Sequence, residues 1–366
     1  MHCKHFGVCG GCTLPGVPYA EQLEQKRSDL TRLLRHDVPP LIPSSSDAGF
    51  RSKVAFVFGA GGRHLVMGHY AAGSQKIIPI DECPVHHARG NRVAFAVRDH
   101  LARVTSIGPL LRHVIIRVTA DGREAAAMLV VHRNDKALRA PVKKFLASAE
   151  KPDGFFVNIH DKPGPFMVGE ETLKIEGRSH VKEVVNGVSY LVSPTAFFQT
   201  NVGAAGELAT LVLEATQGSK TVLDLYCGSG FFALQMVRAG ARVTAIEENR
   251  QAIKDADANV RLNRLPEDQV RLIAGKVEDE LQRLSTRLQP DAVVLDPPRQ
   301  GCPPKVLSAV FEQMRPPKVV YVSCNPDALA KELPVILKTG YRVTRVQPVD
   351  MFPHTSHIET VMVFAR

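Results

Sequence analysis

The feature that most constrains the fold is a regular alternation of strand-like and helix-like segments that begins near Ala204. Seven stretches rich in β-branched residues occur in this half of the chain, and segments of helical periodicity separate the first six. The strand candidates are residues 221–227, 241–247, 269–275, 291–296, 319–323, 341–349 and 359–365. This alternation predicts an α/β fold with a doubly wound, mainly parallel sheet.

The first half of the chain has a different pattern. Residues 1–18 are rich in Cys, Gly and Pro, and residues 19–36 have helical periodicity with Leu23, Leu30, Leu33 and Leu34 as the apolar stripe. Residues 50–191 read as strands and turns, with one helix between 90 and 103 and a type I′ hairpin turn at Asn186-Gly187. We therefore expect four parts: a cysteine segment (1–18), a helix with its linker (19–40), a central antiparallel α+β domain (41–192) and the α/β domain (193–366).

The stretch TVLDLYCGSGFFAL (221–234) predicts a strand, a tight glycine turn and the start of a helix. A glycine turn of this kind binds several nucleotide cofactors. Asp224 near the strand end would repel a pyrophosphate but suits the ammonium group of S-adenosylmethionine, and Glu247 ends the next strand, where a carboxylate binds ribose hydroxyls. Together these residues favour S-adenosylmethionine over NAD.

Two further residues come directly after strands of the predicted sheet. Asp296 follows the fourth strand and precedes Pro297-Pro298, which suits either the cofactor crevice or a capping aspartate before a rigid loop. Cys324 follows the fifth strand and precedes Asn325-Pro326, a favoured helix start. A thiol at a helix N-terminus is expected to have a lowered pKa, so Cys324 is a candidate nucleophile rather than a core thiol.

The start of the last strand supplies a possible base for that nucleophile. If the last strand inserts antiparallel beside the fifth, Glu359 at its start faces Cys324 across the crevice. A thiolate and a carboxylate together suit methylation at carbon 5 of uracil. The thiolate adds at carbon 6 to activate carbon 5, and the base later removes the carbon 5 proton.

Charge and cysteine usage restrict the partners and the compartment. The formal net charge of +9 favours a polyanionic partner, and nucleic acid is the commonest. The chain has neither a signal-peptide pattern nor an apolar run of membrane-spanning length, so we expect a cytoplasmic protein without membrane association. Nothing in the sequence predicts an obligate protein partner.

Three cysteines are concentrated at the N-terminus. Cys3, Cys9 and Cys12 have the spacing C-x5-C-x2-C, and Cys83 follows much later. Four thiolates suit either zinc or an iron–sulfur cluster, and the spacing does not choose between them. His2, His5, His86 and His87 keep a mixed zinc site open.

Five motifs, in order, resemble those of the RNA uridine C5-methyltransferases. They are FFQTN (197–201), DLYCGSGFF (224–232), DPPRQG (296–301), SCNP (323–326) and DMFPHTSHIE (350–359). The resemblance covers nearly the whole chain and implies a Rossmann-like S-adenosylmethionine-dependent methyltransferase domain. It implies Cys324 as nucleophile and Glu359 as base.

The same resemblance implies the binding residues. By matching motif positions, the S-adenosylmethionine contacts are Gln199, Tyr226, Glu247 and Asp296. Phe231 departs from the small or polar residue that relatives often have, which puts contacts at that edge in doubt.

A 4Fe–4S cluster on Cys3, Cys9, Cys12 and Cys83 is implied by similarity to the ribosomal-RNA branch, with a structural role. GFRSKVAFVFG (49–59) is also similar to a family motif, and Arg51 and Lys53 are candidates for phosphate contact or for an ordinary solvated strand edge.

The chain starts directly at the cysteines, as in the short branch that methylates a hairpin-loop uridine of 23S ribosomal RNA. We therefore expect that RNA as the substrate. Another uridine of 23S ribosomal RNA, or transfer RNA, is the alternative. Three other classes also bear on the sequence: a nicotinamide oxidoreductase, a cytosine methyltransferase and a non-catalytic iron–sulfur RNA-binding protein. An oxidoreductase does not need Cys324 opposite Glu359, and a binding protein does not account for a methyl-transfer site. A cytosine methyltransferase also uses a thiolate, but its base-reading contacts differ.

Overall fold

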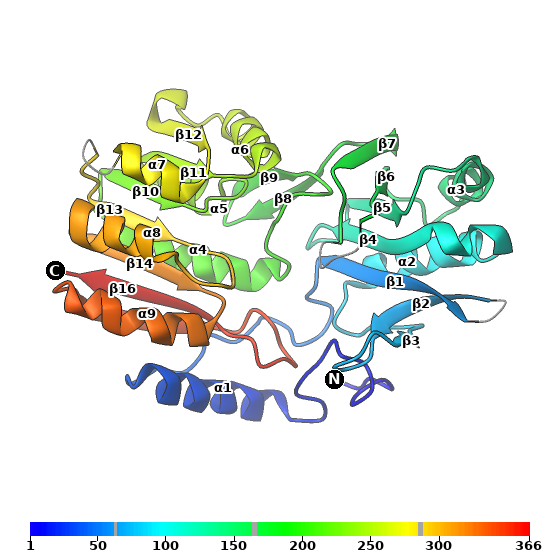
Figure 1. Ribbon diagram of the computed structural model, residues 1–366, viewed down its shortest axis with the longest axis horizontal. Helices are drawn as coiled ribbons and strands as arrows, with labels where there is room; N and C mark the ends of the chain where they lie inside the picture. The colour runs from blue at the N-terminus through cyan, green and yellow to red at the C-terminus, as the bar shows by residue number, and fades with distance from the viewer. Residues whose placement is uncertain (62–63, 163–166, 285–287) are drawn as a thin grey trace.

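The computed structural model describes residues 1–61, 64–162, 167–284 and 288–366. Two seven-stranded sheets form the two halves of the molecule, and a two-stranded hairpin lies between them in Figure 1. The C-terminal half contains the predicted α/β domain, and helix α1 (Tyr19–Leu34) runs along its lower side. Within the described ranges, no helix is long and apolar enough to cross a membrane.

The sheet of the C-terminal half has the strand order β12-β11-β10-β13-β14-β16-β15. Its strands are β10 (Thr221–Leu225), β11 (Arg242–Glu247), β12 (Val270–Ala274), β13 (Ala292–Leu295), β14 (Lys318–Ser323), β15 (Arg342–Val349) and β16 (Glu359–Ala365). The first five strands of this order are parallel, and β16 is antiparallel to both neighbours. The seven predicted strands and the insertion of the last strand beside the fifth are confirmed.

Helices cover both faces of this sheet and bury the apolar side chains of its strands. One face packs against α4 (Val202–Thr216), α5 (Phe231–Arg238) and α6 (Arg250–Leu262). The other packs against α1, α7 (Val277–Leu284), α8 (Pro304–Ser308) with the π-helical turn Ala309–Met314, and α9 (Pro326–Lys338). Because both faces are covered, β10, β13 and β14 in the middle of the sheet are buried along almost their whole length, whereas β12 at the edge is only partly buried.

The buried face of α1 differs from the predicted stripe. Leu30 and Leu34 are buried, but Leu33 is exposed, and the N-terminal half of the helix buries Gln22 and Lys26 instead. These two polar side chains fit in the interior because residues 350–354 supply their partners. Periodicity alone predicts an apolar stripe and does not reveal buried polar side chains of this kind, whose partners lie far away in the sequence.

The sheet of the N-terminal half has the order β3-β2-β1-β4-β5-β6-β7. Its strands are β1 (Lys53–Gly61), β2 (His64–Tyr70), β3 (Ile77–Pro79), β4 (Leu111–Val118), β5 (Ala125–Val131), β6 (Gly154–Ile159) and β7 (Glu171–Gly177). The pairing is antiparallel except for β5 and β6, which are parallel. The purely antiparallel prediction is wrong for this pair because the unpredicted α3 (Arg139–Leu146) forms a crossover between the two strands.

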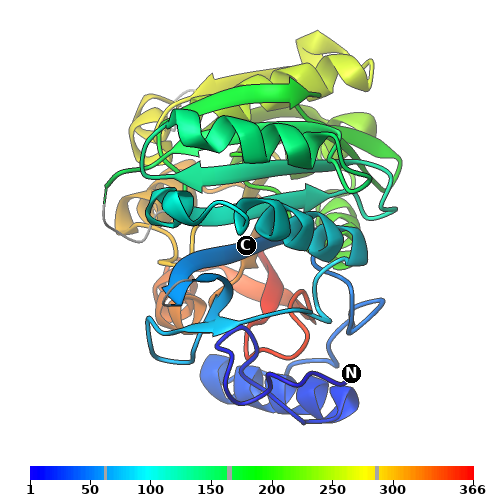
Figure 2. The ribbon, with the colours of Figure 1, turned by 90° about the vertical axis from the view of Figure 1, so that its right-hand side faces the viewer.

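The central sheet also packs on both sides. Helices α2 (Ala88–Leu101) and α3 cover one face, which faces the viewer in Figure 2. The other face shares a core with the hairpin of β8 (Val181–Val185) and β9 (Val188–Val192), which also packs against α4, α5 and α6. Asn186 and Gly187 both have positive φ, as a type I′ turn requires, so this predicted hairpin is confirmed.

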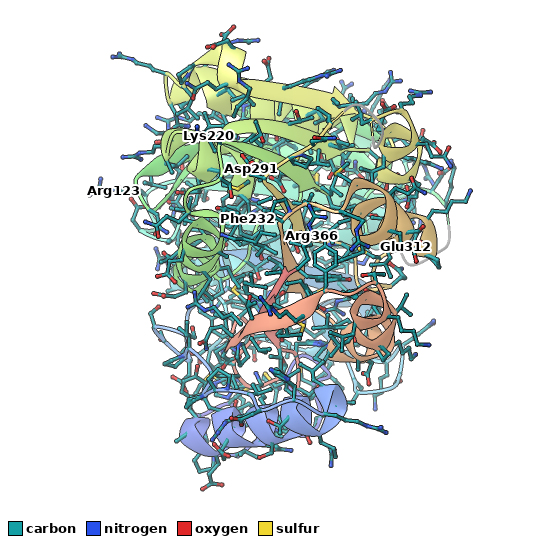
Figure 3. All side chains as sticks on the ribbon, turned by 90° about the vertical axis from the view of Figure 1, so that its left-hand side faces the viewer. Arg123, Lys220, Phe232, Asp291, Glu312 and Arg366 are labelled. Atoms are coloured by element: carbon teal, nitrogen blue, oxygen red, sulfur yellow. The ribbon has the colours of Figure 1, made fainter. Side chains whose placement is uncertain are left out.

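The two ends of the parallel strands in the α/β sheet differ. Figure 3 faces the edge where β10 and β13 begin, with Lys220 and Asp291 beside each other. Asp291 Oδ2 accepts hydrogen bonds from the N–H groups of Lys220 and Thr221 at 2.8 and 2.9 Å, which closes this edge with local contacts. The candidate site lies at the other edge, where the parallel strands end.

Candidate functional site

A cavity of about 480 Å³ lies at the carboxyl ends of the parallel strands. The residues that the family motifs imply for catalysis and cofactor binding line it: Gln199, Tyr226, Glu247, Asp296, Cys324 and Glu359. They are far apart in the sequence, but most of them directly follow or end a strand of one sheet. Parallel strands bring their carboxyl ends to the same edge, which is why these residues meet.

Cys324 and Glu359 approach each other through the pairing of β14 with β16. Ser323 pairs with Thr360, so the next residue of each strand toward the cavity is Cys324 and Glu359 respectively. The helix start after Cys324 is as predicted: the Asn325 side chain accepts a hydrogen bond from Asp327 N at 3.1 Å. Asn325 Nδ2 also donates to Arg299 O at 2.8 Å and thereby joins the SCNP and DPPRQG motifs.

The predicted lowering of the Cys324 pKa is wrong for the free protein. Burial, followed by the carboxyl groups of Glu359 and Asp296, raises the pKa of Cys324 to about 11, and Arg299 opposes the rise. The helix start contributes partial charges only, whereas desolvation and two acidic neighbours act on the whole thiolate charge.

Acidic groups are concentrated around this cavity. Burial, followed by Glu247, raises the pKa of Asp296 to about 7. Burial and then Asp296 raise the pKa of Glu359 well above its usual range, against the opposing effect of Arg299. Buried carboxyl groups with so few cations suit a ligand that carries positive charge.

Asp224 lies deeper than the sequence suggested. It is fully buried and is not among the residues that line the cavity. Burial and then Asp296 raise its pKa well above the usual range, while the backbone N–H of Ala233 opposes the rise. Asp224 therefore adds to the acidity behind the cavity rather than forming its wall.

The glycine turn shapes one wall of the cavity. Gly230 has a φ of 83°, and a Cβ there would lie 2.3 Å from Leu234 Cδ1. Gly228 N donates to Glu247 Oε2 at 3.1 Å, and Asn249 N donates to Glu247 Oε1 at 2.8 Å, so the turn fixes the carboxylate of Glu247. Tyr226, at a φ of 66°, has a buried hydroxyl without a hydrogen-bond partner among the described residues.

Aromatic rings form the opposite wall beside Gln199. Phe231 packs against Phe198 and Tyr190, with ring centroids 5.7 Å apart in each pair. Tyr190 Oη donates to Phe231 O at 2.8 Å. Phe231 thus lines the cavity as part of an aromatic cluster, which explains how the domain accommodates a large side chain there.

A second cavity, of about 490 Å³, lies between the N-terminal segment and the central sheet. All four cysteines predicted as ligands line it: Cys3, Cys9, Cys12 and Cys83. Arg51 and Lys53 line it too and are half-buried, so they do not form an ordinary solvated strand edge. Burial raises the pKa of Cys12 to about 11 and that of Cys83 to about 12, whereas Arg51 lowers the pKa of Cys12.

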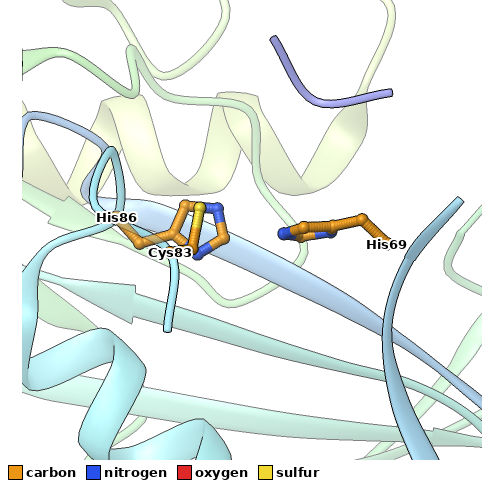
Figure 4. A group of neighbouring side chains, drawn as sticks. All are labelled: His69, Cys83 and His86. Carbon is orange, nitrogen blue, oxygen red and sulfur yellow. The ribbon is translucent and has the colours of Figure 1, made fainter. Parts of the chain in front are cut away.

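Two histidines add nitrogen donors to this cavity. In the described part of the chain, His69, Cys83 and His86 form the group whose donor atoms all lie within 4.8 Å of one another. In Figure 4 the His69 ring, from β2, points toward Cys83 and His86. His86 is almost fully buried, and its Nδ1 has no partner among the described residues. The sequence had suggested His86 but not His69, which lies on a separate strand.

Comparisons with known proteins agree with this architecture. The chain is 32% identical to an uncharacterised RNA methyltransferase of Geobacter sulfurreducens, over all of this chain and 77% of the relative. It is equally identical to one of Caldanaerobacter subterraneus, over all of this chain and 84% of that one.

A solved structure is similar as well. It is the tRNA (uracil-54, C5)-methyltransferase of Pyrococcus abyssi in complex with S-adenosyl-L-homocysteine. The TM-score is 0.80 at 28% identity, covering 98% of this chain and 85% of that one. The sequence model of the tRNA (uracil-5-)-methyltransferase family matches residues 18–366. The chain therefore belongs to the tRNA (uracil-5-)-methyltransferase family.

Proposed function

We propose that this protein transfers a methyl group from S-adenosylmethionine to carbon 5 of a uridine in RNA, giving 5-methyluridine. The observation that carries the proposal is the shared cavity of Cys324 and Glu359 at the end of the β14–β16 pair. A thiol beside a carboxyl group supplies both the nucleophile and the base that this reaction requires.

The chemistry assigns one role to each residue. Cys324 Sγ, as the thiolate, adds to carbon 6 of uracil, and the electron pair moves toward carbon 5 as an enolate. Carbon 5 then takes the methyl group from the sulfonium, and S-adenosylhomocysteine leaves. Glu359 accepts the proton from carbon 5, the bond between carbon 6 and sulfur breaks, and Cys324 departs as a thiolate.

The acidic surroundings suit the methyl donor. S-adenosylmethionine carries a sulfonium and an ammonium group. A positive charge beside a buried carboxyl group stabilises its ionised form and so opposes the burial that raises its pKa. We assign its binding to Gln199, Tyr226, Glu247 and Asp296, which line the cavity. Glu247 suits the ribose hydroxyls, and the Tyr226 hydroxyl is available for a hydrogen bond. A dinucleotide pyrophosphate would meet repulsion from the same carboxylates.

We propose a hairpin-loop uridine of 23S ribosomal RNA as the substrate, in the cytoplasm. The net charge of +9 supports an RNA partner, and the target base must leave its stack to reach Cys324. A transfer RNA is the second candidate, because the similar Pyrococcus abyssi enzyme is a tRNA (uracil-54, C5)-methyltransferase.

We also propose that Cys3, Cys9, Cys12 and Cys83 hold a 4Fe–4S cluster with a structural role. Their common cavity and the desolvated sulfur atoms of Cys9, Cys12 and Cys83 support this, because bonding to iron relieves the cost of burying thiolates. The alternative is a zinc ion on His69, Cys83 and His86. Iron, sulfide and zinc analysis of anaerobically purified protein separates the two.

The test of the whole proposal is methyl transfer from labelled S-adenosylmethionine to unmodified 23S ribosomal RNA and to transfer RNA. Cys324→Ala should abolish transfer, while Cys302→Ala, at a buried thiol outside the cavity lining, should retain it. Methyluridine at one ribosomal position, mapped by mass spectrometry, supports the substrate. Label on transfer RNA alone keeps the chemistry and refutes the ribosomal substrate. RNA binding without label on either RNA favours a non-catalytic binding protein.

A further inference from the structure

The loop of residues 350–358, between β15 and β16, leads directly into Glu359. In Figure 1 it is the red loop above α1. Lys26 Nζ of α1 donates to Asp350 Oδ1 at 2.6 Å and to Phe352 O at 3.1 Å. Lys26 and Asp350 form an ion pair, and both side chains are almost fully buried. This pair fixes the start of the loop to α1.

The middle of the loop is held at His354. Gln22 Oε1 accepts from His354 N at 2.8 Å, and Gln22 Nε2 lies 3.1 Å from His354 Nδ1. His354 has a φ of 65°, in the left-handed region that non-glycine residues adopt only when neighbouring contacts hold them there. This conformation therefore depends on the partners that surround it.

The cysteine segment supplies further partners, in addition to Asp47 O, which lies 2.8 Å from His354 Nε2. Thr13 N and Leu14 N donate to His354 O at 2.9 and 3.0 Å. Thr13 Oγ1 accepts from Ser356 N at 2.8 Å. Since Ser356 is three residues before Glu359, these contacts reach from the N-terminal segment almost to the proposed base.

Thr13 also follows Cys12 directly, and Cys12 lines the second cavity. Residues 1–18 contain neither a helix nor a β-strand of the sheets, and Cys9 joins Ala71 only through an isolated bridge. This segment is held by separate contacts, among them the hydrogen bond from Gly10 N to Tyr70 O at 2.9 Å, and its cysteines line the second cavity. The position of Thr13 thus links the second cavity to the loop before Glu359.

We propose that the N-terminal segment positions the proposed base. Thr13 connects the two sites, because it follows Cys12 and its hydrogen bonds hold residues 350–358 in place when the cysteine site is ordered. When the four cysteines hold their metal centre, Thr13 and Leu14 fix His354 and Ser356, and the loop delivers Glu359 to the cavity. When the centre is lost, the loop loosens while the parallel sheet stays intact. This inference rests on the proposed function.

The experiment compares Thr13→Val with Thr13→Ser. Valine keeps the shape but removes the acceptor for Ser356 N, whereas serine keeps the hydroxyl. We expect Thr13→Val to lower kcat about tenfold with the KM for S-adenosylmethionine unchanged, since misplaced catalytic groups cost rate rather than ground-state binding. Thr13→Ser should restore kcat, and Thr105→Val, at an exposed position in the central domain, should match the wild type.

Hydrogen exchange supplies a readout that does not depend on activity. Amides of residues 350–358 should exchange faster in Thr13→Val, in Cys12→Ser and in wild-type protein stripped of metal by a chelator. Unchanged exchange in all three would overturn the inference. A wild-type protein that methylates neither RNA would refute the proposed function, and the exchange measurement would still decide whether the segment fixes the loop.

Discussion

The two cavities of this protein are nearly equal in volume but are built in opposite ways. The first, with Cys324 and Glu359, lies at the ends of strands that neighbouring strands and helices hold on both sides. The second, with the four predicted cysteine ligands, has one wall made of a segment without helices or sheet strands. The fold thus forms the first cavity by itself, whereas we expect the geometry of the second to depend on the metal centre proposed there.

Their charges differ as well. The first cavity gathers acidic groups whose pKa values are raised, and Arg299 is the cation that opposes those shifts at Cys324 and Glu359. The second places Arg51 beside desolvated thiols, and Arg51 lowers the pKa of Cys12. A cationic methyl donor suits the first, and a thiolate-bound metal centre suits the second.

The largest effect at the first cavity is expected for Glu359→Gln. This variant keeps the nucleophile but removes the base, so the adduct between Cys324 and methylated uracil should accumulate. Turnover should fall by on the order of 10³-fold, within the usual contribution of a general base. A denaturing gel with labelled RNA should show the covalent complex for Glu359→Gln, and the double variant with Cys324→Ala should show none.

The next largest effect is the pH dependence. With the pKa of Cys324 raised to about 11, the thiolate is the minor form at neutral pH and its fraction rises as protons are removed. Because Glu359 must also be deprotonated, both groups give the same sign. We expect kcat/KM, which reports the free enzyme, to rise by about tenfold for each pH unit from neutrality until it levels off near the pKa of Cys324, and more steeply wherever Glu359 is also still protonated.

A flat pH profile would contradict the raised thiol pKa. Arg299→Gln sharpens the test, because Arg299 lowers the pKa of both Cys324 and Glu359. Its loss should shift the rise to higher pH. The same variant should leave the metal content of the second cavity unchanged.

The first cavity was largely predictable from the sequence, and the reason is topological. A doubly wound sheet brings the carboxyl ends of its parallel strands together, so Asp296 and Cys324, which each follow a predicted strand, could be placed at the same end of the sheet. The direction of the Cys324 pKa could not be predicted, because burial and neighbouring carboxylates appear only once the chain is folded. The burial of Asp224 behind the wall was missed for the same reason.

The second cavity was predictable only as a list of donors. The cysteine spacing indicated a metal centre, but His69 gave no local signal, because strand pairing rather than spacing brings it near Cys83. The buried polar residues of α1 were also missed. Gln22 and Lys26 are buried because they bind His354 and Asp350, and the sequence does not reveal these partners. Long-range partners of this kind leave no periodic pattern in the sequence.

A smaller effect is expected at the second cavity, where metal analysis of two variants should show which side chains bind the metal centre. Cys83→Ser removes a ligand common to the cluster and to the zinc alternative, so metal content should fall with either centre. His69→Ala should leave iron and sulfide unchanged if the four cysteines hold a cluster. Loss of the centre should lower the unfolding temperature by roughly 1–3 °C, the effect of about 1–2 kcal/mol in a protein of 366 residues. Zinc lost in His69→Ala would instead favour the mixed site.

The smallest predicted effect tests how rigidly the first cavity is held. Asn325→Ala removes the cap of α9 and the bond to Arg299 O, and we expect a loss of about 1 kcal/mol in the free energy of unfolding. Denaturant unfolding measures this loss. Asp135→Ala, which removes the cap of a short helical turn in the central domain, is a control for capping away from Cys324.

Asn325→Asp separates the two roles of this residue. Aspartate keeps the acceptor for Asp327 N but cannot donate to Arg299 O, so stability should return while the link between the two motifs stays broken. If Asn325→Ala lowers kcat and the aspartate variant recovers it in full, then the sheet and the helix cap alone hold Cys324 in place. If kcat stays low at restored stability, then the first cavity also depends on a loop contact, and its difference from the second is one of degree.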